Sequence, residues 1–174
     1  HVTGRSKSKV RVAFKNYGFS PVKQVYIDPR IDIAIVKIDP KLIPKEAKEA
    51  KLKCDGKVPS GTSVAAFGHP KGLSFSASRG IVSKYRFLSG RDVIQTDTAI
   101  NKGNSGGPLI DMNTGFVIGI NKSSFSKSTG LSFAVPAKNV CIILDLFNEG
   151  KNPSPIKLPI RFAEDREAED YLKV

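Results

Sequence analysis

Gly103-Asn-Ser-Gly-Gly-Pro-Leu109 is the most informative stretch of this sequence. A serine hydroxyl becomes an effective nucleophile only when a base removes its proton and hydrogen-bond donors hold the resulting oxyanion. Glycines around Ser105 allow successive backbone N–H groups to turn into one small concavity, and they leave space for a substrate carbonyl. The alternative is a glycine-rich turn that carries an incidental serine. The string Asn-Ser-Gly-Gly-Pro-Leu is longer than a bare Gly-x-Ser-x-Gly, and its length favours a catalytic serine.

The two histidines, His1 and His69, both precede Ser105. An α/β-hydrolase places its histidine after the serine, so that class lacks a base here. Two orders remain: His1, Asp32, Ser105, as in chymotrypsin, and Asp32, His69, Ser105, as in subtilisin. Subtilisin needs helices between its strands, whereas in this chain strand follows strand. We therefore expect His1 to be the base and His69 to be a loop residue.

Asp32 is the candidate carboxylate that orients the base. It precedes the apolar run Ile-Ala-Ile-Val-Lys-Ile, which is typical of a buried strand. The alternative for Asp32 is a turn residue that follows Pro29.

Short alternating segments separated by Gly, Pro, Asn and Ser predict an all-β chain, with about six strands after residue 58 and about three before it. Residues 40–57 are expected to connect two β units. Pro136, followed by residues 137–149, is typical of a helix that begins with proline, and Gly150 ends it. The tail after residue 150 carries a linker signal and an acidic, helix-prone end.

Composition excludes several classes of protein. The chain has 174 residues and a net charge of +12, with the basic residues spread along it and no aromatic stacking motif among them, so we expect a solvated basic surface and no nucleic-acid partner. No apolar run approaches the roughly 20 residues that a membrane span needs, so we expect no stable membrane insertion. The sequence opens at His1 without a Met, a basic start or an apolar core typical of a signal peptide, so we expect a processed or trimmed chain. Cys54 and Cys141 fit no metal spacing, and we expect two buried free thiols, with a disulfide between them as the alternative.

Seven short segments, in this order, resemble the protease domain of the HtrA/Deg family within the trypsin-like serine proteases, and the likeness runs from His1 to about Leu146. The segments are His1-Val2, Asp28-Pro-Arg-Ile-Asp-Ile-Ala-Ile-Val-Lys-Ile38, Phe67-Gly-His-Pro-Lys-Gly-Leu73, Ser78-Arg-Gly-Ile-Val82, Ile94-Gln-Thr-Asp-Thr-Ala-Ile-Asn-Lys-Gly-Asn-Ser-Gly-Gly-Pro-Leu109, Val117-Ile-Gly-Ile-Asn121 and Ser132-Phe-Ala-Val-Pro136.

The resemblance implies two perpendicular six-stranded antiparallel β-barrels with a cleft between them, followed by a C-terminal helix. Residues 1–57 would be the remainder of the N-terminal barrel with its linker, 58–136 the C-terminal barrel, 137–149 the helix and 150–174 a tail. Because about three strands cannot complete the first barrel, we expect its other strands to come from upstream residues or another chain. Residues 150–174 are too few for a PDZ module.

The resemblance also implies a role for each site residue. Ser105 would attack the scissile carbonyl, His1 would transfer the proton, and Asp32 would hold the imidazole. The oxyanion hole would be formed by Gly103, Asn104 and Ser105. The S1 pocket would be apolar and shallow, which predicts cleavage after small or medium aliphatic residues; its expected lining is Ala99, Ile100, Ile120 and Phe133.

The expected function is therefore that of a serine endopeptidase acting in protein quality control or processing. It needs no cofactor and no metal, and we reject a copper site at His1. The substrates would be polypeptides, while self-association stays open. Members of the family act in the cell envelope or periplasm, in organelles or outside cells, and the resemblance implies one of these locations for this chain. Two alternatives remain: an inactive homologue that binds peptides as a chaperone or scaffold, and a module that binds polyanions.

Overall fold

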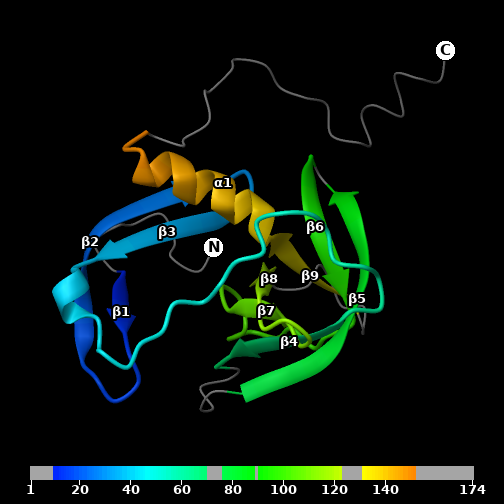
Figure 1. Cartoon of the computed structure of the whole chain (residues 1–174), viewed down its shortest axis with the longest axis horizontal. Coiled ribbons are helices and arrows are strands. Elements are labelled where there is room, and N and C mark those ends of the chain that lie inside the picture. The colour runs from blue at the N-terminus through cyan, green and yellow to red at the C-terminus, as the bar shows by residue number, and fades with distance from the viewer. Residues whose placement is uncertain (1–9, 70–75, 89, 123–130, 152–174) are drawn as a thin grey trace.

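The computed structural model of the chain describes residues 10–69, 76–88, 90–122 and 131–151. Most elements in these residues are antiparallel strands, and one α-helix follows the last strand (Figure 1). In chain order the elements are β1 (Arg11–Ala13), β2 (Phe19–Asp28), β3 (Ile33–Ile38), the 3-10 helix η2 (Pro40–Leu42), β4 (Ser63–Gly68), β5 (Ser76–Leu88), β6 (Arg91–Thr96), β7 (Pro108–Asp111), β8 (Val117–Lys122), β9 (Ser132–Pro136) and α1 (Ala137–Asn148).

Strands β4 to β9 close into a six-stranded barrel in the order β4-β5-β6-β9-β8-β7. The pleat sends alternate side chains inward, and closure leaves no unpaired strand edge. The barrel predicted for the second half of the chain is therefore confirmed. Its interior is filled by Val58, Val64, Ala66, Val82, Ile94, Ile100, Leu109, Ile118 and Ala134.

The N-terminal half forms a three-stranded antiparallel sheet in the order β1-β2-β3. Asp28 pairs with Ile33, so residues 29–32 make the tight turn between β2 and β3. Three strands are too few to close a barrel, so in the described residues the first barrel is partial, as the sequence predicts.

Helix α1 follows Pro136, whose fixed φ suits the start of a helix. It ends before Gly150, which has a φ of 71°. The helix has too few residues and too little apolar surface to cross a membrane, and it is the only α-helix in the part of the chain that the structure describes.

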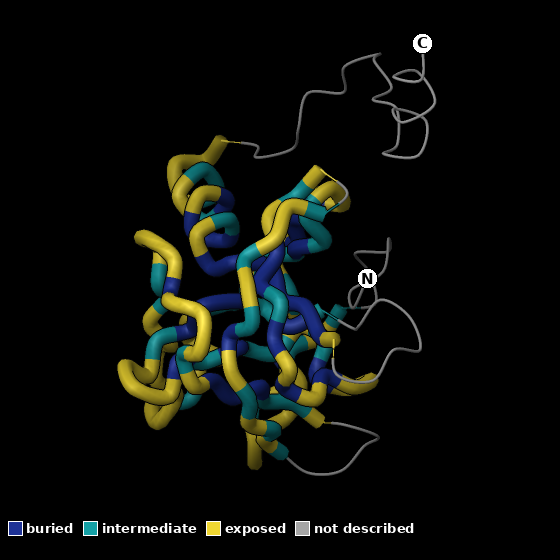
Figure 2. Tube along the Cα trace, turned by 90° about the vertical axis from the view of Figure 1, so that its right-hand side faces the viewer, coloured by how far each residue is buried: buried dark blue, intermediate teal, exposed yellow. Residues whose placement is uncertain are grey.

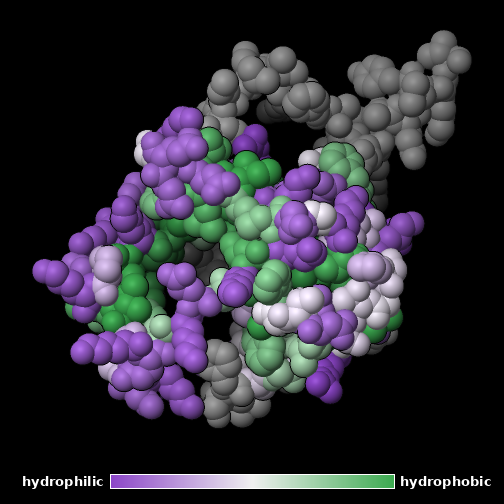
Figure 3. Space-filling model, in the orientation of Figure 1, coloured by the Kyte–Doolittle hydropathy of each residue, from purple (hydrophilic) through white to green (hydrophobic). Residues whose placement is uncertain are grey.

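A second apolar cluster joins the sheet, the barrel and α1. It brings together Tyr26 and Ile33 from the sheet, Val135 from β9, and Val140 and Ile143 from α1. Figure 2 shows the buried side of the helix turned towards the interior, and Figure 3 shows apolar residues gathered near the middle of the molecule. This packing sets the position of the sheet relative to the barrel.

Cys54 and Cys141 form a disulfide, so the prediction of two buried free thiols is wrong. The bond spans 87 residues and attaches the segment between β3 and β4 to α1. Leu52 of the same segment pairs with Val117 at the start of β8, and the Lys53 N–H donates to the Val117 carbonyl at 2.9 Å. The pairing of this segment with β8 brings two sequence-distant cysteines within bonding distance.

Candidate active site

Ser105 lies in a compact loop between β6 and β7, which we call the serine loop (residues 101–107). Two turns shape it: the Asn104 N–H donates to the Asn101 carbonyl and the Gly107 N–H donates to the Asn104 carbonyl, both at 3.0 Å. Gly103 and Gly106 have φ values of 107° and 83°, which side chains other than glycine rarely adopt. The glycines on both sides of Ser105 are therefore required by the backbone path.

The end of β4 packs against the backbone of the serine loop. The His69 N–H donates to the Gly103 carbonyl at 3.0 Å. A Cβ atom added to Gly68 would lie 2.6 Å from the Asn104 Cα and from the Gly103 oxygen, and one added to Gly107 would collide with the Phe67 carbonyl oxygen. Strand and loop thus meet backbone to backbone, which only glycine permits.

Strand β8 holds the other side of the loop. The Gly106 N–H donates to the Asn121 carbonyl and the Asn121 N–H donates to the Gly107 carbonyl, each at 2.8 Å. The Asn121 side chain donates to the Pro108 carbonyl at 3.0 Å. Ser105, which is half-buried, is therefore placed by a loop that is bonded on both flanks.

Two backbone N–H groups of the serine loop, those of Gly103 and Ser105, donate to no acceptor among the described residues. The side chain of Asn104 is buried, with 4% of the residue exposed, and its Nδ2 donates to the Ala99 carbonyl at 3.3 Å. Asn104 therefore holds the loop from inside.

Asp32 is the last residue of the turn between β2 and β3, with a φ of 60°. Asp32 directly precedes strand β3, as the sequence predicts. It also lies in a turn after Pro29, which is the position that the alternative interpretation gave it. The side chain is 16% exposed, and Oδ2 lies 3.3 Å from the Nζ of Lys122 on β8. Partial burial raises the pKa of Asp32, but nearby positive charge, including the Lys122 ammonium, outweighs burial and brings the pKa below its usual value.

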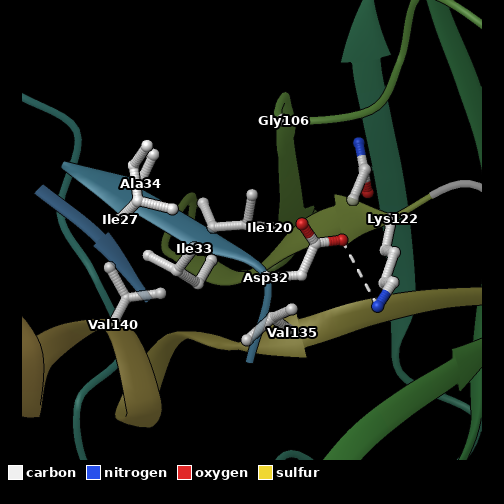
Figure 4. Close-up of a pocket in the computed structure, with 10 residues that line it drawn as sticks. Ile27, Asp32, Ile33, Ala34, Gly106, Ile120, Lys122, Val135 and Val140 are labelled. Carbon is white, nitrogen blue, oxygen red and sulfur yellow. Dashed lines mark ion pairs between the residues drawn. The ribbon is translucent and has the colours of Figure 1, made fainter. Parts of the chain in front are cut away.

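A cavity of about 250 Å³ lies between the sheet, the serine loop and β8. Asp32 enters it from the sheet, Gly106 from the serine loop and Lys122 from β8 (Figure 4). Its remaining lining is Ile27, Ile33, Ala34, Ile120, Asn121, Val135 and Val140. The candidate carboxylate and the residue after Ser105 therefore border one apolar cavity.

The sequence contains two histidines, His1 and His69. His1 lies outside the described residues. His69 follows β4 and is exposed, and its backbone N–H bonds the serine loop. The expectation that His69 is a loop residue agrees with this position.

The four residues expected in the S1 pocket lie in different surroundings. Ala99 is exposed, and its carbonyl also accepts a 2.7 Å hydrogen bond from Ser78 Oγ. Ile100 belongs to the barrel core, and Phe133 is buried on β9. Ile120 lines the cavity beside Asp32.

Lys122 is the residue that sequence reasoning missed. The matched string Val117-Ile-Gly-Ile-Asn121 ends one position before it. A lysine at the end of a largely apolar strand was a signal, because a partly buried ammonium favours a carboxylate partner.

Comparison with known proteins supports the family resemblance. The family model of the trypsin-like peptidase domain matches residues 1–120. The chain is 43% identical to a probable periplasmic DegP-like serine endoprotease of Pseudomonas putida (strain W619), over 77% of this chain and 28% of that protein. It is 37% identical to the chloroplastic Protease Do-like 1 of Arabidopsis thaliana, over 95% of this chain and 39% of that protein.

The fold also agrees with a solved structure. The HtrA-type protease AlgW with decapeptide superposes with a TM-score of 0.73 at 35% identity, over 86% of this chain and 46% of that one. The chain thus spans less than half the length of each of these relatives.

Proposed function

The chain belongs to the trypsin-like peptidase family and resembles its HtrA/Deg members, and from this we propose that it is a serine endopeptidase with His1, Asp32 and Ser105 as its triad. The observation that carries the proposal is the shared cavity, because Asp32 and Gly106, the neighbour of Ser105, border it from two halves of the molecule. An imidazole placed in this cavity would lie between the Asp32 carboxylate and the part of the serine loop that follows Ser105, which is the arrangement that a triad needs.

The triad residues act in sequence. Ser105 Oγ attacks the scissile carbonyl while His1 accepts its proton, which produces a tetrahedral oxyanion. His1 then donates the proton to the leaving amine, and an acyl-enzyme on Ser105 remains until water hydrolyses it. Asp32 stabilises the imidazolium during both transfers.

The oxyanion is held by backbone N–H groups of Gly103 and Ser105. This assignment is supported by the fact that these two N–H groups donate to no acceptor among the described residues. Asn104 contributes by fixing the loop through its bond to the Ala99 carbonyl. Loss of one such donor typically lowers turnover by about 10²–10³.

The S1 site takes small or medium aliphatic side chains. Ala99, Ile100, Ile120 and Phe133 are its proposed lining. Their apolar character would leave the charge of Lys or Arg in the P1 position uncompensated, which is costly on desolvation.

The proposed substrates are exposed or unfolded polypeptides, in protein quality control or processing. The relatives' names place them in the periplasm and the chloroplast, and we propose a cell envelope, an organelle or the extracellular space for this chain. The Cys54–Cys141 disulfide supports an oxidising compartment, where such bonds persist.

One observation favours a second candidate, a homologue that binds peptides without cleaving them. The Asp32 carboxylate is paired with Lys122, and a carboxylate already neutralised by an ammonium stabilises an imidazolium less well.

A labelled fluorophosphonate, which reacts with an activated serine, separates the two candidates. We expect the wild-type protein to be labelled, Ser105→Ala to lose the label, and Ser60→Ala, at an exposed turn, to keep it. An unlabelled but folded wild-type protein would contradict the endopeptidase and support the peptide-binding homologue.

A further inference from the structure

Lys122 and Asp32 connect the two halves of the molecule at the candidate active site. Asp32 ends the turn before β3 in the sheet, and Lys122 is the last residue of β8 in the barrel. Their side chains are only 16% and 18% exposed, and the Nζ–Oδ2 distance is 3.3 Å. Figure 4 shows the two groups pointing towards each other at the edge of the cavity.

The other charged side chains described around this ion pair are either bonded to each other or exposed. Asp32 and Lys122 are the charged residues among those described that line the cavity. Asp28, which is buried, bonds the backbone and side chain of Arg30. The other charged side chains described on elements around the cavity are exposed: Lys23, Arg30, Lys37, Lys102, Lys138 and Asp145.

We propose that Lys122 is a positioning residue for the catalytic carboxylate, and that it sets the pH range in which the triad histidine is neutral and can act as a base. The proposal rests on the function proposed above. The ammonium holds one oxygen of Asp32 and so restricts the direction in which the other oxygen can face the imidazole.

The electrostatic consequence has a defined sign. A carboxylate beside an imidazole stabilises the imidazolium and raises the histidine pKa. An ammonium next to the same carboxylate opposes this effect, so the histidine loses its proton at a lower pH. The enzyme with Lys122 therefore stays active in more acidic solution than one without it, at the expense of weaker stabilisation of the imidazolium in the transition state.

Lys122 is not itself the base. A lysine acts as a base only when its amine is neutral, which requires burial away from negative charge. The Nζ of Lys122 instead lies 3.3 Å from the Asp32 carboxylate.

The test is the pH profile of kcat/KM for Lys122→Met, which removes the charge and keeps most of the side-chain volume. We expect its acidic limb to move upward by about one pH unit. Lys122→Arg keeps the charge and should leave the limb in place. Lys84→Met, at an exposed position on β5, is the matched control and should also leave it in place.

Several outcomes would overturn the proposal. If Ser105 is labelled in Lys122→Met but the acidic limb does not move, Lys122 has only a structural role. If a folded Lys122→Met loses the fluorophosphonate label, Lys122 takes part in the chemistry directly. If the methionine variant does not fold, Lys122→Thr provides the same comparison. If the wild-type protein is not labelled, the proposed function fails first and this inference fails with it.

Discussion

Gly68 lies directly beneath Asn104: a Cβ atom on the glycine would be 2.6 Å from the Asn104 Cα and from its Oδ1. The end of β4 and the serine loop are therefore in backbone contact, one residue away from Ser105. The arrangement of the loop therefore depends on Gly68, which stands 36 positions before Asn104 in the sequence.

Gly68→Ala should displace the serine loop. We expect peptidase turnover to fall by about 100-fold, because small misplacements of catalytic groups have large effects on rate. Gly18→Ala, where the new Cβ meets no atom within 4 Å, should keep its activity. Steady-state kinetics on a peptide substrate, with circular dichroism to confirm folding, would check both variants. Equal turnover in the two variants would contradict the role of this contact.

Asp32→Asn should lower kcat by about 10⁴ while the fold is retained, since the amide favours the wrong imidazole tautomer. Asp55→Asn is the control, because the Asp55 side chain is 91% exposed. Turnover and near-UV circular dichroism measure the two effects separately. A loss below tenfold would show that Asp32 does not assist the base.

The same residue should affect stability in acid. The pKa of Asp32 is lowered in the folded protein, so its charged form stabilises the fold above the unfolded pKa of about 3.9. This stabilisation is lost as the pH falls through the lower folded pKa. The difference in unfolding free energy between wild type and Asp32→Asn should be constant near neutrality and shrink below about pH 4. Urea titrations at several pH values measure it, and a difference that persists to pH 2 would contradict the pKa shift.

Removal of the disulfide should destabilise the protein by about 2–4 kcal/mol, because the bond closes a long loop. Denaturant unfolding with and without a thiol reductant measures this loss. The variant with Cys54→Ser and Cys141→Ser should unfold like the reduced wild type and should not respond to the reductant. An unchanged unfolding midpoint after complete reduction would argue that the bond does not stabilise the fold.

Substrate preference should follow the apolar lining proposed for S1. In a peptide library we expect cleavage after Val, Ala, Ile or Leu, with kcat/KM at least about tenfold higher than after Lys or Arg. Mass spectrometry of the products would identify the cleaved bonds. Predominant cleavage after basic residues would show that the S1 site lies elsewhere or contains an acid.

Local patterns were enough to predict the fold class. Alternation along β4 to β9 identifies strands because each pleat exposes one face and buries the other over a few residues. The serine loop was equally readable, since positive φ values at Gly103 and Gly106 restrict the residues that can stand there. The position of α1 after Pro136 followed from the same kind of short-range rule.

The pairings between distant residues were not readable in this way. Cys54 meets Cys141 because its segment pairs with the start of β8 at Leu52, and Asp32 meets Lys122 because a shared apolar cluster packs the sheet against the barrel. Such contacts depend on how whole elements are packed, and that packing is determined by many weak contacts together. A few consecutive residues around Ser105 were therefore enough to predict the type of chemistry. The ammonium of Lys122 beside the Asp32 carboxylate follows only from the tertiary structure, which packs the two halves of the molecule together.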